Sequence, residues 1–121
     1  MSVLRTKRNE AYSLYVFNCI DLYKYLQLHL RNVEKKFNAE KNSIINSCDK
    51  LIESAIFAYK IIVTNKHEYQ LKKDYLIDMA CWLEKIDVML TIIRNDNGIK
   101  DRILIPCEAL IQKELILIKK E

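Results

Sequence analysis

The sequence predicts an all-α protein, an antiparallel up-down-up-down four-helix bundle built as a single domain over residues 1–121. Three observations predict this fold. One glycine and one proline are too few for the many turns of most β-folds and of alternating β/α folds. The chain is 50% apolar and 30% charged, which is the composition of a globular protein. Its apolar side chains recur every three or four residues, which is the period of a helix.

The first helix is predicted over residues 8–33 and the second over residues 40–64, with a break at residues 37–39. Each has an apolar row with the spacing of helices that pack at a shallow angle. The row of the first helix is Tyr12, Val16, Cys19, Tyr23, Leu26, Leu30, Val33 and Phe37. The row of the second is Ile44, Cys48, Leu51, Ala55, Ala58 and Ile62. The polar residues 64–67 predict the next turn.

The third helix is predicted over residues 68–94 and has two apolar rows. The first row, interpreted as core, is Tyr75, Met79, Trp82, Ile86, Met89 and Ile93. The second row repeats every seven residues and is interpreted as an oligomer interface: Leu76, Leu83 and Leu90. Asn97 and Gly98 end the helix, because either residue adopts the left-handed conformation that a helix stop requires.

The fourth helix is predicted over residues 101–119, with Asp101 as its N-cap. Pro106 cannot donate a backbone hydrogen bond and clashes with the preceding turn. It therefore predicts either a kink or a helix that starts near Ile105.

The apolar rows cover more surface than one bundle of this size buries. A helix in a monomeric bundle needs an apolar face of roughly 100°, whereas the second, third and fourth helices each have two adjacent rows. Large exposed apolar patches mark contact surfaces, and symmetric self-association covers the same patch on every copy. We therefore expect a homo-oligomer. An unusually wide core is the alternative.

No catalytic, metal or cofactor site is expected. A single glycine rules out a glycine-rich phosphate loop, and no Glu-x-x-His pair of a di-iron bundle occurs. His29 and His67 are interpreted as surface or boundary residues. The four cysteines, Cys19, Cys48, Cys81 and Cys107, lack metal spacing and are interpreted as small core residues.

Reduced thiols are typical of the cytoplasm, which is the predicted location. The first residues lack the apolar stretch of a signal peptide. No apolar run of about 18 residues occurs, so no contact with a membrane is expected.

Basic residues gather near the predicted helix ends, and the formal net charge is +4. In an antiparallel bundle one end would combine six candidate nucleic-acid ligands: Arg31, Lys35, Lys36, Arg94, Lys100 and Arg102. Lys41 would lie at the same end. The opposite end would combine Arg5, Lys7, Arg8, Lys66, Lys72, Lys73, Lys119 and Lys120. Such a patch binds phosphate backbone without reading bases. From spacing alone, lysines dispersed for solubility are the better explanation.

Most of the chain, residues 10–120, resembles a known group of proteins. The resemblance lies in a first helix that ends near a Phe, in a long second helix, and in the stretches KKDYLIDMACWLEKIDVMLTIIR (72–94) and IPCEALIQKEL (105–115). The group comprises the accessory variability determinants of diversity-generating retroelements and the related proteins encoded in intervening sequences of ribosomal RNA genes. This chain departs from the retroelement members in being less basic and in having Pro106.

The resemblance implies a barrel-shaped homopentamer of four-helix bundles. It implies no catalytic residues, and it implies binding to a reverse transcriptase and to RNA or DNA through a basic surface that includes Arg94. The sequence thus favours a non-enzymatic accessory protein of a diversity-generating retroelement. A homo-oligomeric interaction scaffold without nucleic-acid binding is the alternative. An enzyme with a site in the bundle core, formed by an inward carboxylate and a histidine, is the third possibility.

Overall fold

The computed structural model describes residues 13–121 and contains four long α-helices. They are α2 (Leu14–Leu30), α3 (Asn38–Lys60), α4 (Lys66–Asn95) and α5 (Asp101–Lys119), and the short 3-10 helix η1 (Lys35–Phe37) precedes α3. No strand occurs within residues 13–121. The predicted all-α class is confirmed. Residues 8–12 of the predicted first helix lie outside the described part of the chain, as do Arg5, Lys7 and Arg8.

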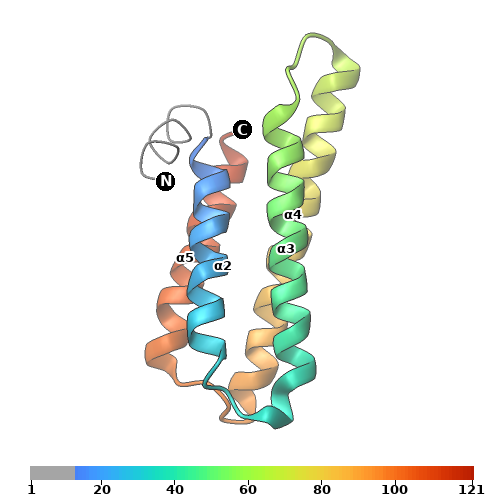
Figure 1. Ribbon diagram of the computed structural model, residues 1–121. Coiled ribbons are helices and arrows are strands. Elements are labelled where there is room, and N and C mark those ends of the chain that lie inside the picture. The colour runs from blue at the N-terminus through green and yellow to red at the C-terminus, as the bar shows by residue number, and fades with distance from the viewer. Residues whose placement is uncertain (1–12) are drawn as a thin grey trace, which may run out of the picture.

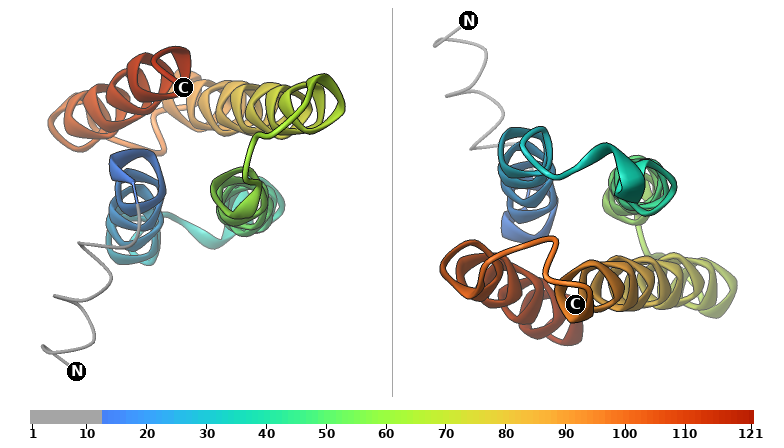
Figure 2. Two further views of the ribbon diagram at one scale, coloured as in Figure 1. Left: turned by 90° about the horizontal axis from the view of Figure 1, so that it is seen from above. Right: turned by 90° about the horizontal axis from the view of Figure 1, so that it is seen from below.

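Successive helices run in opposite directions (Figure 1). Each helix packs beside the preceding and following ones, and α5 returns to lie against α2 (Figure 2). The α3–α4 hairpin extends beyond the ends of α2 and α5, while the turns 31–37 and 96–100 meet at the opposite end (Figure 1). The bundle therefore has one end where two chain turns and the starts of α3 and α5 come together.

The helix boundaries differ from the prediction by a few residues. Helix α2 ends at Leu30 and α3 at Lys60, not at residues 33 and 64. The break lies at residues 31–34, and Phe37 belongs to η1, where its side chain is buried. Helix α4 begins at Lys66, because the Asn65 side chain accepts a hydrogen bond from the Glu68 backbone N–H at 2.8 Å.

The core row of α4 differs from the predicted one. Leu76, Leu83 and Leu90 are buried inside the bundle, together with Met79, Ile86 and Ile93. Leu76, Leu83 and Leu90 are therefore core residues, and their assignment to an oligomer interface is wrong. Tyr75, Trp82 and Met89, predicted as core, are only partly buried beside it. Leucine fits the closed interior, whereas tyrosine and tryptophan keep their polar atoms near water at its edge.

A different apolar row of α4 faces outward. We call Ile77, Cys81, Val88 and Ile92 the outer stripe; all four are exposed, Ile77 by 58% of its surface. Their spacing places them on one side of the helix, opposite the buried leucines. Cys81 therefore contradicts its predicted burial, whereas Cys19, Cys48 and Cys107 are buried as predicted.

Helix α5 starts at Asp101 and continues through Pro106, which is exposed. The alternative start near Ile105 is therefore wrong. The N-cap is Lys100, not Asp101, and it makes no side-chain capping hydrogen bond. Asp101 instead lies in the first helical turn, where its carboxylate is favoured by the helix dipole and reaches a basic side chain described below.

Candidate nucleic-acid interface

The turn after α4 is a tightly hydrogen-bonded helix stop. Asn97 has a left-handed backbone with φ of 61°, its N–H donates to Arg94 O at 2.9 Å, and Gly98 N–H donates to Ile93 O at 2.8 Å. These two bonds satisfy carbonyls that a helix end leaves open. The sequence predicted a left-handed residue at either Asn97 or Gly98, and the structure shows that it is Asn97.

Gly98 is required for a different reason, which is space. A Cβ atom at this position would lie 2.4 Å from Phe37 Cε2 and 2.6 Å from Ile93 Cγ2. The turn between α4 and α5 thus rests directly on the buried ring that precedes α3. This contact fixes the two turns relative to each other, and with them the basic side chains that they hold.

We call residues 31–41 and 94–102 the basic pole, because both segments lie at the same end of the bundle (Figure 1). They contain seven basic and four acidic residues. All six candidate ligands lie in these segments with exposed side chains: Arg31, Lys35, Lys36, Arg94, Lys100 and Arg102. The fold brings them to one end from two separate segments of the chain.

Two of the six are paired with carboxylates. Arg94 Nε donates to Asp101 Oδ1 at 2.8 Å, and Lys36 Nζ lies 4.0 Å from Glu34 Oε2. The hydrogen bond from Arg94 and its charge lower the pKa of Asp101. Within residues 13–121, Arg31, Lys35, Lys100 and Arg102 form no ion pair. These four cations are the ones available to an anionic partner.

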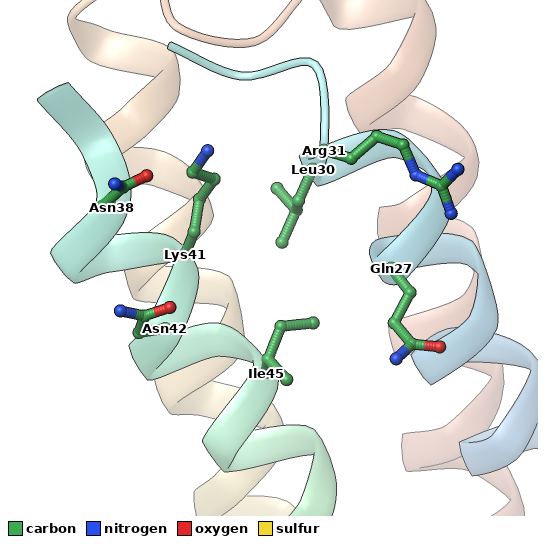
Figure 3. Close-up of a pocket in the computed structure, with 7 residues that line it drawn as sticks. All are labelled: Gln27, Leu30, Arg31, Asn38, Lys41, Asn42 and Ile45. Carbon is green, nitrogen blue, oxygen red and sulfur yellow. The ribbon is translucent and has the colours of Figure 1, made fainter. Parts of the chain in front are cut away.

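A pocket of about 450 Å³ opens beside this end, between the last turn of α2 and the first turns of α3 (Figure 3). It is lined by Gln27, Leu30, Arg31, Asn38, Lys41, Asn42 and Ile45. Sequence reasoning missed its three amides. The spacing of Asn38 and Asn42, one turn apart at the start of a helix, was the available signal.

The sequence prediction also missed a buried carboxyl between α2 and α5. Glu114 is 0% exposed; its Oε1 accepts from Asn18 Nδ2 at 3.0 Å and its Oε2 accepts from Cys19 Sγ at 2.8 Å. Burial raises the pKa of Glu114 to about 7, against the effect of these two hydrogen bonds. Glu114 continues the apolar row of Leu104, Cys107 and Ile111 at the same spacing, a signal that could have found it.

The Glu114 cluster can hold and release a proton, but neither histidine joins it. His29 lies against the Tyr25 ring with centroids 4.2 Å apart, and His67 is exposed in the first turn of α4. Burial also raises the pKa of the Cys19 thiol well above its ordinary value. The cluster thus lacks the inward carboxylate–histidine arrangement that an enzyme site in the core requires.

A second acidic contact links α4 and α5. Partial burial raises the pKa of Glu108 to about 7, and a hydrogen bond shared with Asp87 adds to the rise.

Among the described residues, no group of three or more His, Cys, Asp or Glu side chains is placed to hold a metal ion. None of the described helices is both long and apolar enough to span a bilayer.

Comparison of the chain with protein-family models, with curated proteins and with solved structures finds no match.

Proposed function

We propose that this protein is a non-enzymatic, oligomeric helical bundle that binds RNA or DNA at its basic pole and acts as the accessory protein of a reverse transcriptase in a diversity-generating retroelement. The observation that supports nucleic-acid binding is the set of four unpaired, exposed cations at one end: Arg31, Lys35, Lys100 and Arg102. The reverse transcriptase and the retroelement rest on the sequence resemblance. Copurification with a reverse transcriptase encoded beside this chain tests that part.

The rigidity of the basic pole favours binding to phosphates. Its turns are held by the helix stop at Asn97 and by the packing of Gly98 against Phe37. Cations on a rigid frame lose less conformational entropy when they bind. Because they contact the backbone and not the bases, binding would be independent of sequence and sensitive to salt.

Neutralising three of these cations is the test of the interface. We consider the triple variant Lys35→Gln, Lys100→Gln and Arg102→Gln. It is expected to bind a labelled oligonucleotide about tenfold more weakly at low salt, because it loses contacts to phosphates. Each lost contact should also reduce the steepness of the salt dependence by about 0.7 to 0.9. Fluorescence anisotropy over a salt series measures both quantities. Wild-type protein that binds neither RNA nor DNA at low salt would refute nucleic-acid binding.

A matched variant separates position from net charge. Lys60, Lys66 and Lys120 are exposed and lie away from the basic pole. Changing all three to glutamine removes the same charge and is expected to change affinity only slightly. Equal losses in the two triple variants would show that overall charge, and not the basic pole, attracts the nucleic acid.

The outer stripe supports the oligomeric part of the proposal, in place of the buried leucines. Ile77, Val88 and Ile92 expose apolar surface along one side of α4, and a symmetric assembly would cover this surface on every copy. The resemblance implies five copies.

The double variant Ile77→Glu and Val88→Glu is expected to dissociate the assembly to the monomer mass of 14.4 kDa, because it places charges where apolar surfaces meet. Light scattering at micromolar concentration measures the mass. Leu28→Glu is the control, since Leu28 is 54% exposed on α2 and lies outside the stripe. A wild-type protein that is already monomeric would contradict self-association.

The second candidate function is a homo-oligomeric interaction scaffold without nucleic-acid binding. The pairs Arg94–Asp101 and Lys36–Glu34 favour it, because they neutralise part of the basic pole. The apolar surface at the projecting end of the α3–α4 hairpin favours it as well, where Ile62 is 76% exposed. An assembly that forms normally but binds no oligonucleotide would establish this alternative.

A further inference from the structure

The pocket between α2 and α3 differs in charge from three other surface pockets of the described residues. Arg31 and Lys41 contribute two cations to its lining, and none of its seven lining residues is acidic. The pockets beside Arg94, beside Phe57 and beside Trp82 each include at least one carboxylate: Asp101, then Asp49 and Glu53, then Asp78. An anionic ligand is therefore matched at the α2–α3 pocket and opposed in part at the others.

The polar groups of the pocket surround an apolar floor (Figure 3). Leu30 from α2 and Ile45 from α3 extend toward each other across the gap, while Asn38 and Asn42 lie one turn apart on the α3 side. Gln27 lies on the α2 side, where its Nε2 donates to Tyr23 Oη at 2.8 Å. This bond leaves the amide oxygen of Gln27 as an acceptor for a ligand.

Two cations lie at the rim. Lys41 Nζ donates to Val33 O at 2.8 Å, which holds the ammonium group at the mouth of the pocket and leaves it two further N–H donors. The guanidinium of Arg31 lies on the α2 side and points away from the gap and from Lys41 (Figure 3). The pocket thus combines a cationic rim, amides that both donate and accept, and an aliphatic floor.

We propose that this pocket accepts one unstacked base of a single-stranded nucleic acid, with the adjoining phosphates held separately by Lys41 and Arg31. The proposal rests on the proposed function and names the form of nucleic acid that the basic pole selects. The volume of the pocket, about 450 Å³, lies in the range of small-molecule sites. Asn and Gln amides match the mixed donors and acceptors of a base edge, and only a strand with free bases can present that edge and one face together.

The test compares oligonucleotides that differ only in their bases. Fluorescence anisotropy of the full-length protein is measured with a labelled single-stranded oligonucleotide and with an abasic oligonucleotide of the same length. The wild-type protein is expected to bind the normal strand about tenfold more tightly, which is the size of one good set of base contacts. A blunt duplex of the same sequence is expected to bind no better than the abasic strand.

Asn42→Leu removes an amide from the pocket lining without changing charge. Because Asn42 is exposed on a helix and leucine is a strong helix former, the variant is expected to fold. It should bind the normal and the abasic strands equally weakly, with the salt slope of the wild-type protein. Asn46→Leu is the matched control one turn further along α3, since Asn46 is exposed and does not line the pocket. It should keep the tenfold preference.

The outcomes separate this inference from the proposed function. Equal wild-type affinity for normal and abasic strands, or for single strands and duplex, would overturn the base pocket while the charge variants still test the basic pole. A free nucleoside monophosphate that competes as well as the whole strand would also overturn it, because the pocket would then be a small-molecule site. Absence of binding to every oligonucleotide at low salt would overturn both.

Discussion

Replacing Glu114 by glutamine is expected to stabilise the protein by about 2 to 3 kcal/mol at pH 8 and to have little effect near pH 4. The pKa of Glu114 is about 7 in the folded protein, compared with an ordinary value of 4.5. Each unit of this difference corresponds to about 1.4 kcal/mol. Glutamine has the same shape and no charge, so it removes the cost of burying a carboxylate.

The sign follows from the direction of the shift. The folded state binds the Glu114 proton more tightly than the unfolded state does, because burial disfavours the carboxylate. The stability that this proton contributes is therefore fully present below about pH 4.5 and is lost as the pH rises through about 7. Above that pH the wild-type protein contains a buried charge, held only by Asn18 and Cys19.

Denaturant unfolding of both proteins from pH 4 to pH 8 measures the difference. Glu108 acts in the same direction, because its pKa is also raised to about 7; Glu114→Gln should therefore reduce the pH dependence without abolishing it. Glu84→Gln is the control, since Glu84 is exposed on α4. A Glu114→Gln variant that is less stable than the wild-type protein at pH 8 would show that the carboxylate is net stabilising there.

Replacing Leu83 by alanine is expected to lower the free energy of unfolding by about 3 kcal/mol. Leu83 is 0% exposed in the middle of the α4 core row, between Met79 and Ile86. Removing its branched side chain loses apolar burial and leaves a cavity between helices. The same change at Leu28, which is exposed on α2, should cost less than about 0.5 kcal/mol.

This comparison decides between core and interface for the buried leucines. Urea unfolding gives the stability, and light scattering on the same samples gives the mass. If Leu83 is a core residue, the Leu83→Ala variant should be less stable than the wild-type protein, and the mass of its folded form should be the same. A Leu83→Ala variant that keeps its stability and dissociates would restore the interface interpretation.

Helix formation and the helix stop after the third helix depend on local sequence, and the sequence was sufficient to predict them. The three-and-four spacing of apolar residues predicted four helices, and the run from Asn95 to Gly98 predicted the end of the third, because backbone conformation there depends on the residue itself. The six basic residues near the helix ends meet at a single pole because successive helices run in opposite directions. The predicted helix ends at residues 33 and 64 were wrong, because the sequence has no strong helix-stop signal at either position.

The choice between adjacent rows on α4 could not be made from periodicity. The row of Tyr75, Trp82 and Met89 and the row of Leu76, Leu83 and Leu90 share the same spacing, and a rotation of one residue exchanges them. Packing against α3 and α5 made the choice, and it left Cys81 outside.

Charge pairing and desolvation likewise depend on neighbours far along the chain. Arg94 meets Asp101 only because the turn folds back over Phe37, and Glu114 meets Asn18 and Cys19 across more than ninety residues. The sequence by itself determined that this protein is helical, where its third and fourth helices end and which residues are charged. Only the tertiary structure decided which of those charges are buried, paired or free, because desolvation and Coulomb energies depend on distances between helices that no local pattern sets.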